Sequence, residues 1–240
     1  MVALFMANKK TQLPVAILAG GLATRMLPLT ESMPKSLLLV NGEPFIAHQL
    51  RLLRTQGITE AVLCTGFLGE QIVSYVGEGR AFGVNVQYSD DGEKALGTAG
   101  AIRQALPLLG TSFFVLYGDS YLMCNFSAVE MAFLDSKKMG LMTLYANRGL
   151  YDRSNVEFAD GTIRKYDKKV ATPEMQHIDY GLGVFMAEAF EGYEEGAPLD
   201  LECVYQDLLT KGQLGAFEVH ERFYEIGSFS GLHELGELLA

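Results

Sequence analysis

The chain has 240 residues, of which 49% are hydrophobic and 20% charged, and its formal net charge is −10. This composition is typical of a globular protein, and the length suits one sizeable α/β domain. The acidic balance disfavours DNA or RNA as the main partner, because nucleic-acid binding needs clustered cations that neutralise phosphates. No apolar run reaches the roughly 18 residues that a membrane-spanning helix requires, so we expect no membrane association.

The cysteines and histidines indicate neither a metal site nor a disulfide framework. Cys64, Cys124 and Cys203 are odd in number and far apart, and the four histidines lack metal-ligand spacing. We therefore expect a reducing, cytoplasmic location. Residues 1–12 carry a short apolar patch with a Lys pair on the wrong side for a secretory signal, and are interpreted as an N-terminal extension.

The first half alternates apolar, β-branched runs with amphipathic ones. In chain order we expect a strand at 13–20, a helix at 44–57, a strand at 60–66, a helix at 68–79, a strand at 83–89, a helix at 98–110, a strand at 112–119 and a helix at 127–138. Gly57 is placed to end the first of these helices. This spacing predicts a doubly wound, mostly parallel, Rossmann-like sheet with helices on both faces.

The second half changes character. Asp160-Gly161 predicts a tight turn, and therefore a hairpin over 155–167. Further strands are expected at 141–146, 177–187 and 214–228, and helices at 199–212 and 231–240. No linker composition separates the halves, so we expect a single domain over 1–240 whose second half supplies a lid or substrate wall.

The glycines and charges cluster at the predicted ligand edge of the sheet. In open parallel sheets, ligands bind outside the carboxyl ends of the strands. That rule selects the turns at Gly20–Arg25, Gly66, Gly118-Asp119 and Asp179–Gly181.

The first of these turns predicts an anion site. Gly20 and Gly21 let backbone N–H groups approach a ligand closely, and Arg25 and Lys35 add two cations. An isolated pair of glycines would indicate only a strand-to-loop turn. The dinucleotide motif G-x-G-x-x-G is absent, which disfavours a nicotinamide oxidoreductase, and the P-loop G-x-x-x-x-G-K-[ST] is absent too.

The signature that fits is G-G-x-x-T-R-x-x-P-x-T-x-x-x-P-K, which stands as Gly20, Gly21, Thr24, Arg25, Pro28, Thr30, Pro34 and Lys35. It resembles that of the sugar-1-phosphate nucleotidyltransferases, the nucleoside-diphosphate-sugar pyrophosphorylases. Further segments follow in the family's order: LGTAGAI (96–102), YGDS (117–120), YDKK (166–169), IDYGLGVF (178–185) and FYEIGS (223–228). The resemblance covers about residues 14–240 and is nearest to short bacterial enzymes acting on mannose or heptose 1-phosphates.

The resemblance implies a single GT-A-like domain, with a nucleotide-binding half at about 1–125 and a sugar-phosphate-binding half at about 126–240. It implies transfer of a nucleoside monophosphate from an NTP to a sugar 1-phosphate, by Mg²⁺-assisted in-line attack on the α-phosphate. The catalytic residues would be Arg25, Lys35 and Asp119. The nucleotide-binding residues would be Ala19, Gly20, Gly21, Thr24, Arg25, Lys35, Gly66, Gly97 and Thr98. The sugar-phosphate-binding residues would be Gly118, Asp167, Lys168, Asp179 and Gly181, and the metal ligands Asp119 and Glu225.

Four positions depart from the family pattern: Ala23 stands for glycine, Asp167 for glutamate, Asp179 for asparagine and Glu225 for aspartate. A nucleotidyltransferase for a non-sugar phosphate such as phosphocholine, or a non-catalytic sugar-nucleotide sensor, are the alternatives. GTP is favoured as the NTP on subfamily resemblance alone, and the sugar and the oligomeric state stay open.

Overall fold

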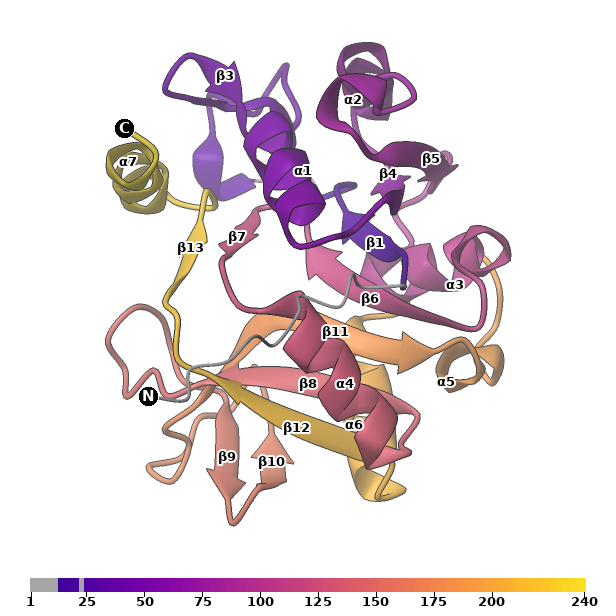
Figure 1. The fold of residues 1–240 in the computed structure, drawn as a ribbon, viewed down its shortest axis with the longest axis vertical. Coiled ribbons are helices and arrows are strands. Elements are labelled where there is room, and N and C mark those ends of the chain that lie inside the picture. The colour runs from indigo at the N-terminus through magenta and orange to yellow at the C-terminus, as the bar shows by residue number, and fades with distance from the viewer. Residues whose placement is uncertain (1–12, 22–23) are drawn as a thin grey trace, which may run out of the picture.

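The structure, a computed structural model, describes residues 13–21 and 24–240. Its centre is a seven-stranded sheet in the order β12-β8-β11-β6-β1-β4-β5 (Figure 1). These strands are β1 (Val15–Leu18), β4 (Glu60–Thr65), β5 (Asn85–Asp90), β6 (Ser112–Tyr117), β8 (Gly140–Tyr145), β11 (Ile178–Met186) and β12 (Leu214–Val219). Both halves of the chain contribute to this one sheet, which confirms the expected α/β architecture.

The sheet is mixed rather than fully parallel. β11 runs antiparallel to both of its neighbours, β6 and β8, while the other pairings of this described sheet are parallel. Leu182 of β11 lies opposite Leu116 of β6, so the first residues of β11 lie beside the last residues of β6. Asp179 and Gly181 therefore reach the ligand edge from the start of a reversed strand.

Helices cover both faces of the sheet. The helices are α1 (Phe45–Thr55), α2 (Gly69–Val76), α3 (Gly97–Leu109), α4 (Phe126–Ser136), α5 (Glu188–Glu191), α6 (Leu201–Thr210) and α7 (Phe229–Leu238), with short 3₁₀ helices η1 (Thr24–Met26), η2 (Lys35–Leu37) and η3 (Arg80–Phe82). Apolar side chains of α1, α2 and α4 pack into one core, and those of α3, α5 and α6 into the other. This two-sided burial explains why the strands read as nearly continuous apolar runs.

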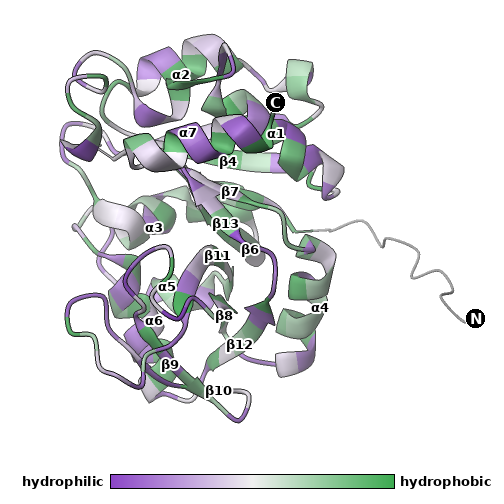
Figure 2. Ribbon diagram, turned by 90° about the vertical axis from the view of Figure 1, so that its left-hand side faces the viewer, coloured by the Kyte–Doolittle hydropathy of each residue, from purple (hydrophilic) through white to green (hydrophobic). Residues whose placement is uncertain are grey.

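The described residues also form three two-stranded ribbons: β2 (Leu39–Val40) with β3 (Glu43–Pro44), β7 (Ser120–Leu122) with β13 (Phe223–Glu225), and β9 (Val156–Ala159) with β10 (Thr162–Tyr166). The β9–β10 ribbon is the predicted hairpin, and its turn residues Asp160 and Gly161 have φ values of +52° and +71°. Figure 2 shows it at the far end of the molecule from α1, α2 and α7.

The single strand expected at 214–228 is wrong, because the segment divides into β12 and β13. β12 pairs with β8 in the central sheet, whereas β13 leaves that sheet and pairs with β7. After β13, α7 packs its Leu235 against Ile226, Phe45 and Tyr121 in a third apolar cluster. Only His220, Glu221 and Arg222 separate the two strands, and so short a polar interval does not by itself indicate a change of partner.

No helix in the described part of the chain is long and apolar enough to span a membrane. The predicted N-terminal extension at 1–12 and the departure at Ala23 lie outside the described residues.

Candidate active site

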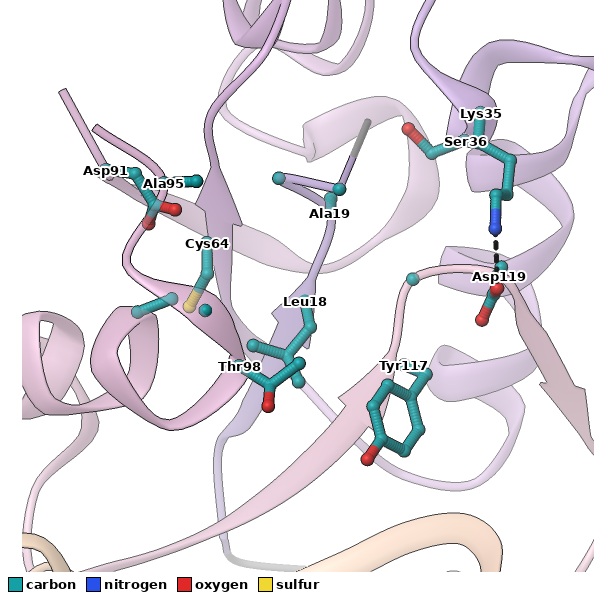
Figure 3. A pocket seen from close by; sticks show the side chains of 15 residues that line it. Leu18, Ala19, Lys35, Ser36, Cys64, Asp91, Ala95, Thr98, Tyr117 and Asp119 are labelled. Atoms are coloured by element: carbon teal, nitrogen blue, oxygen red, sulfur yellow. Dashed lines mark hydrogen bonds and ion pairs between the residues drawn. The ribbon is translucent and has the colours of Figure 1, made fainter. Parts of the chain in front are cut away.

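A cavity of about 370 Å³ opens at the carboxyl ends of β1 and β6 (Figure 3). It is lined by Leu18, Ala19, Gly20, Gly21, Lys35, Ser36, Cys64, Asp91, Ala95, Gly97, Thr98, Ala101, Tyr117, Gly118 and Asp119. Residues from the loop after β1, from η2, from the start of α3 and from the end of β6 thus meet around one space. It lies at the edge of the sheet where the strand-end rule predicted a ligand.

The glycines around this cavity are of two kinds: some allow close backbone packing, and one does not pack closely against the described protein. A Cβ on Gly118 would lie 2.5 Å from the carbonyl oxygen of Leu18, and a Cβ on Gly66 would lie 3.0 Å from that of Gly20. At both positions glycine allows neighbouring backbones to approach each other at the strand ends. A Cβ on Gly21 would meet no described atom within 4 Å, although Gly21 lines the cavity. Close packing within the described protein therefore does not explain the glycine at 21.

Lys35 and Asp119 form an ion pair beside the cavity. The Lys35 Nζ lies 2.8 Å from Asp119 Oδ2, and the two side chains are 18% and 28% exposed. Lys35 is brought there by η2, which follows the extended Pro34, and Asp119 by the turn after β6. Two predicted catalytic residues that are distant in sequence are thus in contact. We call this pair, with Ala19–Gly21 and Gly118, the glycine-loop end of the site.

Glu225 reaches the same end through the β13–β7 ribbon, in which it pairs with Ser120. Its carboxylate accepts hydrogen bonds from the Gly227 N–H and from the Ser228 hydroxyl at the start of α7. A Cβ on Gly231 would lie only 2.1 Å from Glu225 Oε1. The glycine at 231 therefore makes room for the longer acidic side chain, which is folded back over the helix N-terminus, where a negative charge is favourable.

Asp119 and Glu225 provide an oxygen-rich donor set suitable for a hard cation. A Cβ on Gly227 would lie 2.6 Å from Glu225 Oε2 and 3.5 Å from Asp119 Oδ2, so both carboxylates approach one point. The Lys35 ammonium is also 3.5 Å from that point and is paired with Asp119. In the described residues no three His, Cys, Asp or Glu side chains gather as a metal site. A cation here would need ligands from a substrate as well.

Lys168 extends toward the cavity from the loop after β10. Its Nζ donates a hydrogen bond to the Tyr117 hydroxyl at 3.1 Å and lies 5.3 Å from the centre of the Tyr117 ring. Burial of the ammonium acts to lower the pKa of Lys168, but Tyr117 and Asp179 together outweigh it and raise the pKa above its usual value. Lys168 is therefore a cation across the physiological range. With Tyr117, Tyr166 and Asp179 it forms what we call the Lys168 end of the site.

Asp179 is held within this end by hydrogen bonds to both carboxylate oxygens. Oδ1 accepts from the Gly181 N–H at 3.1 Å, and Oδ2 accepts from the Tyr166 hydroxyl at 3.1 Å. Desolvation raises the pKa of Asp179 above 3.8, although the charge of Lys168 and these hydrogen bonds act to lower it. Gly181 has a φ of +97° at the irregular step of β11, which turns the chain around the carboxylate.

Eight predicted site residues lie outside the lining of the cavity: Lys168, Asp179, Gly181 and Glu225, described above, and Asp167, Thr24, Arg25 and Gly66. Asp167 accepts hydrogen bonds from the N–H groups of Lys169 and Val170, which form a local turn and lower its pKa. Thr24 and Arg25 are exposed in η1, and Gly66 packs against the backbone of Gly20. Thr98 does line the cavity, but its hydroxyl also accepts a hydrogen bond from the Leu201 N–H at 2.7 Å.

Sequence reasoning assigned no role to Ser36, Asp91 or Tyr117, which are polar residues that line the cavity. Asp91 faces the space; it accepts a hydrogen bond from the Leu96 N–H, and its desolvation raises its pKa. Tyr117 received no role, because an aromatic residue that ends a buried strand resembles any core position. Its position directly before the Gly118-Asp119 turn was the available signal.

Comparison with known proteins agrees with this geometry. A family model described as nucleotidyl transferase matches residues 15–169. The chain belongs to this family. An N-acetylmuramate alpha-1-phosphate uridylyltransferase of Neisseria meningitidis is 33% identical to it over 223 residues, covering 91% of this chain and 94% of the relative. The family predicted from the glycine-loop signature is thereby confirmed.

Other similar proteins share the length and the fold. A D-glycero-alpha-D-manno-heptose 1-phosphate guanylyltransferase of Campylobacter jejuni is 27% identical, covering 88% of this chain and 93% of the relative. The crystal structure of HddC from Yersinia pseudotuberculosis has a TM-score of 0.80 at 22% identity, covering 95% of this chain and all of that one (100%). The structural likeness confirms the predicted fold class of this nucleotidyl transferase family member.

Proposed function

We propose that this nucleotidyl transferase family member transfers a nucleoside monophosphate from an NTP to a sugar 1-phosphate, giving an NDP-sugar and pyrophosphate. The observation that carries the proposal is the Lys35–Asp119 contact at 2.8 Å, in a cavity that Ala19, Gly20 and Gly21 also line. The relatives of similar length carry names that describe this type of reaction. The resemblance of the sequence to sugar-1-phosphate nucleotidyltransferases supports the same conclusion.

The proposed mechanism needs no protein nucleophile, because the sugar phosphate oxygen itself attacks the α-phosphorus in line. Positioning and charge neutralisation then supply the catalysis. The N–H groups of Gly20 and Gly21 hold the nucleotide, and Lys35 neutralises the charge that builds on the α-phosphate. Arg25, a planar fork suited to phosphate oxygens, binds the β- and γ-phosphates. Lys168 binds the phosphate of the sugar substrate.

Asp119 and Glu225 are the residues that would hold Mg²⁺, which would neutralise phosphate charge when bound. The remaining assignments follow from position: Gly97 and Thr98 border the nucleotide, Gly66 packs against Gly20 of the glycine loop, and Gly118, Asp179 and Gly181 shape the sugar-phosphate side. Asp167 acts by forming the turn that presents Lys168, since its carboxylate binds the two following N–H groups. The division at about residue 125 into nucleotide and sugar-phosphate halves is part of the same proposal.

GTP is our proposed nucleotide, supported by the guanylyltransferases among the relatives. UTP is the competing candidate, because the Neisseria meningitidis relative is named a uridylyltransferase. A cytoplasmic location is likewise proposed, in keeping with cysteines that are free in the structure.

The test is a matrix of four NTPs against several sugar 1-phosphates and phosphocholine, scored by pyrophosphate release. The acceptors should include mannose, heptose, glucose and N-acetylmuramate 1-phosphates. We expect release with a sugar 1-phosphate, dependent on Mg²⁺ and lost with a chelator. Release with phosphocholine alone would replace the sugar assignment, and no release with any pair would favour a sensor.

The exposed Arg25 provides a second test of the same proposal. Arg25→Ala should lower turnover about 10²–10³-fold, as removal of a charge-stabilising contact does. Arg80→Ala is the matched control, because Arg80 is also an exposed arginine of a short 3₁₀ helix, η3, and pairs with Glu78. Equal, near-normal turnover in the two variants would remove Arg25 from the site.

A further inference from the structure

The Lys168 ammonium lies against a wall of the nucleotide cavity. Its hydrogen-bond acceptor, the Tyr117 hydroxyl, is 3.1 Å away, and Tyr117 lines the cavity next to Gly118 and Asp119 (Figure 3). Tyr117 is the last residue of β6 and lies in register with Leu18 of β1. One aromatic side chain thus touches both the cavity and the cation that is proposed to receive the sugar phosphate.

A second contact connects Lys168 to the same cavity through its backbone. The Lys168 N–H donates to Glu202 Oε1 at 2.8 Å, in the first turn of α6. The next residue back, Leu201, donates its N–H to Thr98 Oγ1 at 2.7 Å, and Thr98 lines the cavity. The side chain of Lys168 therefore contacts the cavity-lining Tyr117 directly, whereas its backbone is held by Glu202, next to the Leu201 that bonds the cavity-lining Thr98.

The surroundings keep Lys168 protonated and Tyr117 neutral. The ionisable groups that act on Lys168 are Tyr117, Asp179 and Asp200. Burial, followed by the charge of Asp179, raises the pKa of Tyr117 above its usual value, so the phenol stays neutral and accepts the lysine hydrogen bond. A lysine side chain otherwise samples many rotamers, and fixing it before the substrate arrives lowers the entropy cost of binding.

We infer that Tyr117 is a positioning residue of the sugar-phosphate site, whose ring and hydroxyl hold the Lys168 ammonium at the junction between the nucleotide cavity and the second half of the chain. The inference rests on the proposed function, since it assigns Lys168 a sugar phosphate to bind. It adds a residue to which the family motifs gave no role.

The experiment is a double-mutant cycle of Tyr117→Phe and Lys168→Met. Phenylalanine keeps the ring and removes the hydroxyl that fixes a charged donor, so we expect the KM for the sugar 1-phosphate to rise about tenfold. The sugar 1-phosphate used is the one that gives most product in the substrate matrix. NTP affinity, measured by calorimetry without sugar phosphate, should change less than twofold. In the Lys168→Met background, Tyr117→Phe should have no further effect on this KM.

Additivity is the outcome that would overturn the inference. If Tyr117→Phe raises the KM equally with and without Lys168, or weakens NTP binding as much as sugar-phosphate binding, Tyr117 does not act through Lys168. Lys169→Met is the matched control. In that background, Tyr117→Phe should still raise the KM for the sugar 1-phosphate about tenfold. Urea unfolding of every variant separates loss of fold from loss of positioning. A wild-type chain that releases no pyrophosphate rejects the proposed function first, whereas an active wild type with an additive cycle rejects only the role of Tyr117.

Discussion

The two ends of the candidate site differ in composition, one being formed mainly by backbone and the other by side chains. The glycine-loop end consists mainly of backbone: Gly20 lies against Gly66, Gly118 lies against Leu18, and one ion pair, Lys35 with Asp119, stands beside them. The Lys168 end consists of side chains held by other side chains. Tyr117, Tyr166 and Asp179 come from β6, β10 and β11, and each is fixed by a hydrogen bond across elements.

This difference explains why the second end was predicted less completely than the first: Lys168 and Asp179 were expected there, whereas Tyr117 and Tyr166 were not. Backbone packing at a strand end needs glycine at fixed spacing, and such spacing is a local pattern. A side-chain network needs only compatible partners in space, and many residue types satisfy it. Asp179 illustrates the point, because its two carboxylate oxygens are satisfied by Gly181 and Tyr166.

The largest expected effect comes from breaking the ion pair of the glycine-loop end. Asp119→Asn removes the charge that Lys35 contacts and one of two proposed metal ligands, so turnover should fall at least about 10²–10³-fold. The pair is partly exposed, and such pairs contribute only about 0–1 kcal/mol to folding. Asp119→Asn should therefore lose pyrophosphate release while its urea unfolding stays close to that of wild type. Near-normal turnover would show that the charges at this end are not catalytic.

The next effect distinguishes glycines that pack the backbone from one that faces the cavity. Gly118→Ala places a Cβ 2.5 Å from the Leu18 carbonyl oxygen, and such overpacking should lower the free energy of unfolding by about 1–3 kcal/mol. Gly21→Ala has open space around its new Cβ among the described residues, so it should unfold like wild type. It should instead weaken NTP binding, measured by calorimetry. Equal loss of stability in both variants would contradict the division.

The smallest effect concerns the desolvated carboxylate of the Lys168 end. The pKa of Asp179 is raised on folding, so the native state retains its proton at pH values where the unfolded chain has released it. This group's contribution to stability is therefore present below about pH 4, near its unfolded value, and is lost as pH rises through the native pKa. Asp179→Asn should become more stable than wild type as pH increases. A urea midpoint difference that stays constant from pH 4 to 8 would exclude this titration.

Much of the fold was predictable because burial imposes a period on the sequence. The strands β1, β4, β5, β6, β8 and β11 and the helices α1, α2, α3, α4, α6 and α7 were all expected close to their observed bounds. The short ribbons were not, since two- and three-residue strands such as β2 and β7 are too brief to show a period. The division between β12 and β13 was not predicted for another reason. A strand-like pattern indicates that a segment is extended, but it does not indicate which strand that segment pairs with.

The sequence by itself determined the family, the order of the elements and the glycine loop, because each depends on residues that are neighbours along the chain. Only the tertiary structure decided which side chains meet. Lys35 and Asp119 are 84 positions apart, and Tyr117 and Lys168 are 51 apart. Their contacts follow from the order of strands in the sheet and from the reversed direction of β11, neither of which a local pattern encodes. The tertiary structure also decided the position of Glu225, because Gly231 in the following helix leaves room for its longer side chain.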